Sequence, residues 1–317
     1  MIVMRKTDYT FEDLSRIYIE DMDGRLKRTT MKTKRRIFDQ LILPVFGKMH
    51  VSRITPADIR AWQNTLLTRD FSPSYLRLIY AELIGFFSYA VRLYDLPSNP
   101  CTKAGPICAK PPRNIKIWTI EEFLKFIHGL AGLPEPRLAF LILFFTGLRC
   151  GELLALAPTD IDLARGIIHV NKTYTRQDGE DIITSPKTAK SIRDVTIPNF
   201  LCKEIENYLV NEAPRCEKGF TLASPRLFPH TKYYLGKYMV RACKSTDVKV
   251  IRLHDLRHSH ASYLIDKGVQ VGIISERLGH EKVSTTLDIY GHLYPSRQAE
   301  LAQQMDEWMG CKPVKKV

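Results

Sequence analysis

The first 95 residues carry hydrophobic positions at helical spacing, in four runs separated by residues that favour helix starts. The first run begins at Phe11 and the second ends near Leu43. The third begins at Ile59 and the fourth at Leu76. The expected capping positions are Thr10, Thr29 or Thr30, Thr55 before Pro56, and Ser72 before Pro73. We therefore predict a small four-helix bundle over residues 1–95.

Proline marks the end of this bundle. Residues 96–113 hold five of the 18 prolines of the chain, a density that disfavours both helix and central strand. The pattern predicts an extended linker over residues 96–116.

The remaining residues, 117–317, form the second predicted domain. Thr119 and Glu122 have the spacing of a capping box, and mostly helical pattern follows to Phe145. Between Gly166 and Pro198 the period changes to two, which predicts a three-stranded antiparallel meander. Helical pattern then returns to the end of the chain. The fold class is mainly α with a small antiparallel sheet, an α+β domain behind a helical one.

Composition agrees with two ordinary globular domains in 317 residues. The longest apolar run, residues 138–145, is too short to span a bilayer, and the N-terminus has no apolar signal segment, so we expect a cytoplasmic protein. Seven scattered cysteines without a Cys-x-x-Cys pair indicate neither a disulfide framework nor a zinc site.

Charge adds a first functional indication, because a net charge of +13 favours a polyanionic partner. Residues 1–116 carry 20 basic and 11 acidic side chains, so most of the excess lies in the first third. A solvated basic face is the plain alternative to a DNA-binding surface. The candidate phosphate contacts on the second helix and the linker are Lys27, Arg28, Lys32, Lys34, Arg35, Arg36, Lys103, Lys110, Arg113 and Lys116.

Five short stretches carry candidate chemistry. In the first, Arg149 follows a glycine at a helix start, where it can bind an anion and be fixed by Glu152. In the second, Lys187 lies at a hairpin tip, with Lys190 as a rival three residues later.

The third stretch places His254 and Arg257 on one helical face, a proton carrier beside a phosphate clamp. His258 and His260 lie close by, so a metal site is the alternative, although the acidic partner of a His-Glu-x-x-His motif is missing. We expect no metal here.

The last two stretches are Leu278-Gly-His280 and Asp288-Ile-Tyr290-Gly-His292. Taken singly, His280 is typical of a helix C-cap and Tyr290 of a core tyrosine.

Together and in this order, the five stretches resemble the tyrosine recombinase (phage integrase) family over nearly the whole chain. The resemblance implies a helical, SAM-like core-binding domain over residues 1–95, the basic linker over 96–116 and the catalytic domain over 117–317. Two of the stretches are most similar to integrases of conjugative transposons and temperate phages of low-GC bacteria. They are Thr-Gly-Leu-Arg-Cys-Gly-Glu-Leu and His-Asp-Leu-Arg-His-Ser-His-Ala-Ser.

The resemblance implies a site-specific DNA recombinase that forms a 3′-phosphotyrosyl intermediate and a Holliday junction, with no metal or other cofactor. The roles it implies are Tyr290 as nucleophile, Arg149, Arg257 and His280 as phosphate ligands, Lys187 as general acid, His254 as proton carrier and Glu152 as support. Lys190 remains the alternative to Lys187.

The implied partners are double-stranded DNA with inverted-repeat core sites, a homotetramer on two duplexes, and an accessory excision factor, in the bacterial cytoplasm at the nucleoid. The segment from Ser296, amphipathic through Leu301, Met305 and Trp308, is expected to dock on a neighbouring protomer or to pack in cis. Related integrases carry a further N-terminal arm-binding domain, so this is either a short member or one from which that domain was removed.

Three other functions stay open at the level of sequence. They are an architectural DNA-binding protein without strand transfer, a type IB topoisomerase with similar arginine, lysine and tyrosine chemistry, and a chromosome-dimer resolvase of the same family.

Overall fold

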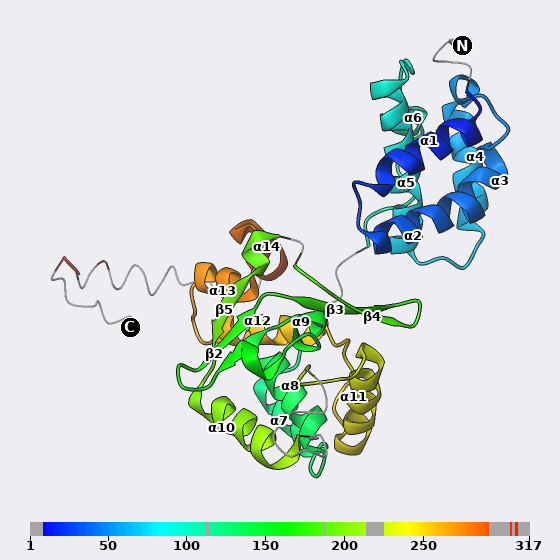
Figure 1. The fold of residues 1–317 in the computed structure, drawn as a ribbon. Helices are drawn as coiled ribbons and strands as arrows, with labels where there is room; N and C mark the ends of the chain where they lie inside the picture. Colours follow the sequence, from blue (N-terminus) through cyan, green and yellow to red (C-terminus); the bar gives the residue numbers. More distant parts are fainter. Residues whose placement is uncertain are drawn as a thin grey trace. The chain divides into compact units, whose positions relative to one another are not determined.

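The computed structural model describes residues 9–111, 115–186, 188–213 and 225–291, together with residues 305, 308 and 309. The chain divides into two compact units, Met1–Arg113 and Asn114–Val317 (Figure 1). Among the described residues, none of the helices has the length and apolarity that crossing a bilayer requires.

The regular secondary structure in the described part of the first unit is helical, and one isolated antiparallel bridge joins Thr10 to His50. Its α-helices are α1 (Phe11–Asp23), α2 (Arg28–Ile37), α3 (Leu43–Phe46), α4 (Pro56–Leu67), α5 (Pro73–Leu93) and α6 (Pro100–Ala104). A π-helical turn, η1 (Phe38–Ile42), joins α2 to α3, and a 3-10 turn, η2 (Val51–Arg53), precedes α4.

Three of the four predicted helix starts are confirmed. Thr10 and Ser72 accept a backbone N–H of the first turn, and Thr55 forms a reciprocal capping box with Asp58. The prediction for the second helix was wrong by two or three residues, because α2 begins at Arg28 after Lys27, which makes no side-chain cap.

The proline-rich segment differs from the extended linker that we predicted. Asn99 caps α6, and Pro100 occupies its first position, where the missing N–H leaves no bond unmade. Cys101, Ala104 and Ile107 are buried in the core of the first unit. Much of the predicted linker is therefore part of the first domain.

Lys34 also departs from the sequence interpretation. Its side chain is 6% exposed, pairs with Glu82 and donates to the Tyr18 hydroxyl at 2.9 Å. Burial disfavours the ammonium, but the bonds to Glu82 and Tyr18 outweigh it and raise the pKa of Lys34. Lys34 is thus a core residue of the bundle rather than part of an exposed basic face.

The second unit surrounds two small sheets with helices. The α-helices are α7 (Ile120–His128), α8 (Pro134–Thr146), α9 (Cys150–Leu153), α10 (Asn199–Asn207), α11 (Lys232–Thr246), α12 (Asp255–Asp266), α13 (Val271–Leu278) and α14 (Val283–Tyr290). Short 3-10 or π turns are η3 (Pro158–Asp160), η4 (Ala189–Ser191) and η5 (Tyr208–Glu212). The capping box of Thr119 and Glu122 is confirmed at the start of α7.

The strands are antiparallel, as predicted, but they do not form one meander. Strands β1 (Ile161–Asp162), β2 (Ile167–Val170) and β5 (Arg193–Thr196) pair in the order β1-β2-β5. Strands β3 (Thr173–Gln177) and β4 (Glu180–Thr184) pair only with each other. Their turn has positive φ at Asp178 and Gly179, the geometry of a tight hairpin, so this pair closes on itself.

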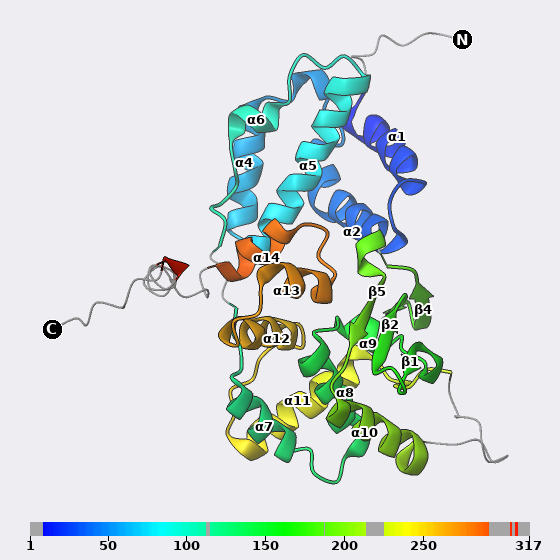
Figure 2. The ribbon, with the colours of Figure 1, turned by 90° about the vertical axis from the view of Figure 1, so that its left-hand side faces the viewer.

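Helix α8 is the centre of the second unit. Most of its residues from Leu138 to Phe144 are fully buried, and α12 packs against it. Helix α13 contacts α12, α14 and β5, and Figure 2 shows α12, α13 and α14 stacked in that order. This stack brings the third, fourth and fifth motifs close together in space.

The buried ion pair predicts the effect of a Lys34→Met substitution. The change leaves the Glu82 carboxylate without its cation, which costs about 3–5 kcal/mol of the free energy of unfolding. Arg36→Met on the exposed face of the same helix should change stability by less than about 0.5 kcal/mol. Denaturant unfolding of the full chain, followed by circular dichroism, measures the stability of both variants. Equal stabilities of the Lys34→Met and Arg36→Met variants would contradict a buried ion pair between Lys34 and Glu82.

Candidate active site

Arg149 lies where α8 ends and α9 begins. Gly147 ends α8 with φ +67°, and an added Cβ there would lie 2.6 Å from the His260 ring, so this turn requires glycine. The Arg149 backbone N–H donates to Glu152 Oε2 at 2.9 Å, and its guanidinium donates to Oε1 at 2.7 Å. The Arg149 side chain remains 37% exposed, so its position is fixed while the guanidinium still faces solvent.

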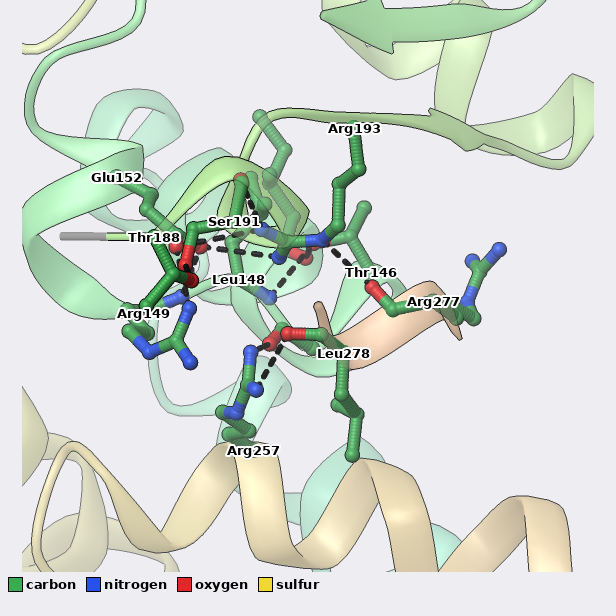
Figure 3. Close-up of polar contacts among 12 residues, drawn as sticks. Thr146, Leu148, Arg149, Glu152, Thr188, Ser191, Arg193, Arg257, Arg277 and Leu278 are labelled. Carbon is green, nitrogen blue, oxygen red and sulfur yellow. Dashed lines mark hydrogen bonds and ion pairs between the residues drawn. The ribbon is translucent and has the colours of Figure 1, made fainter. Parts of the chain in front are cut away.

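Glu152 is the buried anchor of this arrangement, with its side chain 3% exposed. Besides Arg149 it accepts two bonds from Arg193, whose Nη2 lies 3.0 Å from Oε2 (Figure 3). Burial disfavours the carboxylate, but the bonds and charges of Arg193 and Arg149 outweigh it and lower the pKa of Glu152. Glu152 is therefore ionised between two arginines.

Arg193 was not singled out as a site residue from the sequence. Its Nε donates to the carbonyl of Arg277 at 2.8 Å, so it joins β5 to the end of α13 as well as to Glu152. The signal was present in the strand pattern, because Arg193 shares a strand face with buried Val195. An arginine on a core-facing position predicts a buried acid partner.

Arg257 is 3% exposed in the first turn of α12. Its two terminal nitrogens donate to the carbonyls of Gly147, at 2.8 Å, and Leu278, at 2.5 Å (Figure 3). Burial and the positive charge of Arg149 lower the pKa of Arg257 to about 9. The guanidinium thus lies between the ends of α8 and α13, the two segments that carry the first and fourth motifs.

His280 follows Gly279, which ends α13 in the left-handed conformation with φ +65°. Its Nδ1 lies 2.8 Å from the Thr286 hydroxyl. Burial and the charges of Arg257 and Arg149 lower the pKa of His280 to about 4, which keeps the imidazole neutral at pH 7.

An open cleft of about 470 Å³ lies over these groups. It is lined by Arg149, Glu152, Thr173, Pro186, Thr188, Ser191, Gly279, His280, Glu281 and Thr285. The cleft joins the first, second and fourth motifs.

Tyr290 ends α14 and is 2% exposed, in a cluster with Ala261, Ile265, Ile274 and Leu278. Its hydroxyl lies 2.5 Å from His258 Nδ1. Burial raises the pKa of Tyr290 to about 12, although the charge of Arg257 opposes the rise. The hydroxyl partner is thus His258, a residue to which the sequence interpretation gave no role in transesterification.

His254 is the N-cap residue of α12, with its ring centroid 5.0 Å from that of His258. Desolvation and the charges of Arg257 and Arg149 lower the pKa of His254.

His258 and His260 of α12 have different side-chain partners, which bears on the alternative of a metal site. His258 contacts Tyr290, whereas the Nε2 of His260 accepts from Arg277 at 3.1 Å. In the part of the chain that the structure describes, no three potential ligands converge on one point.

Several predicted residues lie outside the described ranges. Lys187, Arg113 and most of the segment from 296 fall there, although Met305 and Trp308 are described and exposed. Lys190 is exposed, and its Nζ donates to the Glu281 carbonyl at 3.0 Å, beside the cleft.

The remaining basic residues are at the surface of their own unit. Arg35 pairs with Asp23 at 2.9 Å. The exposed members of the predicted set are Lys27, Arg28, Lys32, Arg35, Arg36, Lys103, Lys110 and Lys116.

Comparisons with known proteins match both units of the chain to phage integrases. Residues 119–297 match the model described as phage integrase family, and residues 10–67 match phage integrase, N-terminal SAM-like domain. The chain is 35% identical to the ICEBs1 integrase of Bacillus subtilis, over 94% of this chain and 83% of that protein. It is 29% identical to a XerC-like tyrosine recombinase of Caldanaerobacter subterraneus subsp. tengcongensis, over 82% and 72% of the two chains.

Solved structures share the fold at low sequence identity. The Tn1549 transposon integrase in complex with circular intermediate DNA has a TM-score of 0.77 at 20% identity, covering 95% of this chain and 100% of the other. A lambda integrase tetramer bound to a Holliday junction has a TM-score of 0.64 at 18% identity, covering 98% and 80%.

The arginine pair around Glu152 predicts a pH-dependent stability. Glu152→Gln removes the charge between two cations and should cost about 3–5 kcal/mol at pH 7. Because the folded pKa of Glu152 is lowered from 4.5, its contribution is present above that pH and is lost as the pH falls through the folded value. The difference in stability between wild type and variant should therefore shrink below about pH 4.5.

Urea unfolding between pH 7 and pH 3 measures this difference. Glu206→Gln, an exposed carboxylate on α10, serves as the matched control and should change stability little. A Glu152→Gln difference that stays constant with pH would show that the carboxylate is not held ionised by its neighbours.

Proposed function

The chain belongs to the phage integrase family and is a tyrosine site-specific recombinase of mobile elements, and on that premise we propose how its own residues cut and rejoin DNA. In this proposal Tyr290 is the nucleophile, and the cleft beside Arg149 and His280 receives the scissile phosphate. The observation that carries it is the convergence of three distant motifs on one cleft and the adjoining Arg257.

The phosphate would be held by two arginines of different character. Arg149 is half-exposed and presents its guanidinium to an incoming anion, whereas Arg257 is buried and fixed by two backbone carbonyls. A guanidinium has five N–H donors, so these two bonds leave Arg257 capacity for phosphate oxygens. His280, neutral and bonded to Thr286 through Nδ1, would donate its other N–H to the same oxygens.

The chemical step would be a transesterification. The Tyr290 oxygen forms a bond to phosphorus, the bond from phosphorus to the 5′ oxygen breaks, and a 3′-phosphotyrosyl bond and a 5′-hydroxyl result. The arginines stabilise the charge that develops on the non-bridging oxygens. The reverse step, with a 5′-hydroxyl from the other duplex as attacking group, completes strand exchange.

Two proton carriers complete the step. Lys187 would protonate the 5′ leaving oxygen, with Lys190 as the alternative because its Nζ lies at Glu281 next to the cleft. His254 would take the tyrosyl proton on cleavage and return it on rejoining, and its lowered pKa keeps it able to accept a proton at pH 7. Glu152 would orient Arg149. These groups supply the charge and the protons of the reaction, so the proposal needs no metal or other cofactor.

The DNA would be a duplex with inverted-repeat core sites. The helical first unit and the exposed basic residues of α2 and the segment after α5 would contact the backbone, with Lys34 excluded because it is buried. The lambda integrase structure, a tetramer on a Holliday junction, supports a homotetramer on two duplexes.

Further partners follow from the same proposal. An accessory excision factor would set the direction of the reaction, and the segment from 296 would dock on a neighbouring protomer. Because the substrate is chromosomal and element DNA, the site of action would be the cytoplasm, at the nucleoid.

Two activities compete with integration and excision. Binding without strand transfer is opposed by the complete set of catalytic residue types, and relaxation by a type IB topoisomerase would need neither a specific site nor a second duplex. Dimer resolution by a member of the same family differs only in its target site.

We predict that wild-type protein in EDTA forms a covalent adduct on a nicked suicide substrate carrying the attachment core, and that Tyr290→Phe forms none. The phenolic oxygen is the atom that bonds to phosphorus, so its removal leaves no nucleophile. A denaturing gel detects the adduct, and gel-shift affinity confirms that the variant still binds DNA.

The outcomes separate the candidate activities. Adduct on any duplex, with relaxation of plasmid DNA, would favour the topoisomerase, whereas binding without adduct would favour the architectural protein.

The general acid is identified by a change in the substrate. We expect Lys187→Ala to lower the rate of cleavage about 100-fold or more on normal DNA. On DNA with sulfur at the 5′ bridging position it should cleave at close to the wild-type rate, because a thiolate leaves without a proton. Lys190→Ala serves as the matched control, and rescue of Lys190→Ala instead would transfer the role to Lys190.

A further inference from the structure

The contact between α12 and α14 joins two side chains of which only one has a role in the proposed reaction. The Tyr290 hydroxyl and His258 Nδ1 are 2.5 Å apart, and the ring centroids are 5.5 Å apart. Both residues are buried, at 2% and 9% exposure. A buried polar pair of this kind fixes the orientation of both groups, since each would lose its partner on rotation.

The direction of the hydrogen bond follows from the surroundings. Burial and the neighbouring His254 ring lower the pKa of His258 to about 4, so the imidazole is neutral at pH 7. Burial raises the pKa of Tyr290 to about 12, so the phenol keeps its proton. The phenol is therefore the donor and Nδ1 the acceptor, which places the imidazole proton on Nε2.

Other charged groups face this pair from several elements. His254, Asp255, Arg257 and Arg252 act on His258 from α12 and the residues before it, and His258 itself acts on His280 beyond the end of α13. The pair thus lies inside the electrostatic environment of the proposed phosphate site.

We propose that His258 is a positioning residue for the nucleophile Tyr290. Nδ1 of His258, on α12, accepts the hydrogen bond of the Tyr290 hydroxyl and holds that hydroxyl near Arg257, which is on the same helix. This inference rests on the proposed function and adds a residue to it. The apolar cluster of Ile265, Ile274 and Leu278 holds the body of the Tyr290 ring, but apolar contacts do not fix where a hydroxyl points. The hydrogen bond to His258 supplies that directional constraint.

His258 is distinct from the proton carrier of the proposed mechanism. His254 lies one turn earlier, its ring 5.0 Å from that of His258 and perpendicular to it. Positioning requires only an acceptor at the place of Nδ1, whereas proton transfer requires a group that titrates. This difference allows the two roles to be separated by substitution.

The test compares His258→Leu, which removes the acceptor, with His258→Asn, whose side-chain oxygen replaces Nδ1. Adduct formation is measured in single turnover at saturating protein on suicide DNA, with affinity and thermal unfolding recorded for each variant. We expect His258→Leu to react about 10- to 100-fold more slowly with unchanged DNA affinity, and His258→Asn to recover most of the rate.

The pH profile adds a readout that a structural role would not change. In the wild type, protonation of His258 removes the acceptor, so the rate falls as the pH drops through the pKa of His258. In His258→Asn the acceptor does not titrate, so the acidic decrease should become less steep and keep only the part that His254, His280 and Glu152 contribute. A His258→Leu rate equal to or above the wild type would overturn the proposal, as would equally slow Leu and Asn variants.

A measurement without DNA separates this inference from the proposed function. The ¹⁵N signal of His258 Nδ1 should shift when Tyr290→Phe removes the hydroxyl, and an unchanged signal would overturn the contact. If that signal shifts but wild-type protein forms no adduct on attachment-site DNA, the recombination mechanism fails, and the positioning role fails with it although the contact exists.

Discussion

The carboxylate of Glu152 lies between Arg149 and Arg193, and the geometry of the cleft that Arg149 and Glu152 line depends on this three-residue contact. One arginine is half-exposed and available to an anion, while the other is buried and ties Glu152 to β5 and the end of α13. Without a central anion, two like charges would be forced apart in a region of low dielectric constant. The buried charge of Glu152 is tolerated because each of its two carboxylate oxygens is paired with an arginine.

Much of the fold could be predicted from local signals. The caps at Thr10, Thr55 and Thr119 depend on residues three positions apart, so the sequence shows them directly. The five motifs were found in the same way, because each is a short stretch at a turn or helix end. Helix α6 was missed since its proline content disfavours helix in general, whereas a single short turn that begins with proline is stable when it packs on a core.

What the sequence did not predict depends on contacts between distant segments. The sequence predicts the turn between β3 and β4, but it does not show that β5 pairs with β2 rather than with the free edge of β4. The partners of Arg193 and His258 lie 41 and 32 positions away, and spacing along the chain carries no information on them. For the same reason, the sequence placed Lys34 on a basic surface and did not predict its buried pairing with Glu82.

The anchoring of Arg257 by main-chain carbonyls has a consequence for how the site tolerates change. Every amino acid supplies a carbonyl, so replacing the side chain of Leu278 leaves that hydrogen-bond acceptor in place. Arg149, by contrast, is oriented by a side-chain carboxylate, and any library that varies position 152 also varies the orientation of Arg149. In directed evolution, substitutions at position 152 would therefore change the orientation of Arg149 directly. Substitutions at Gly147 and Leu278, which packing constrains for other reasons, would still leave the carbonyl acceptors of Arg257 in place.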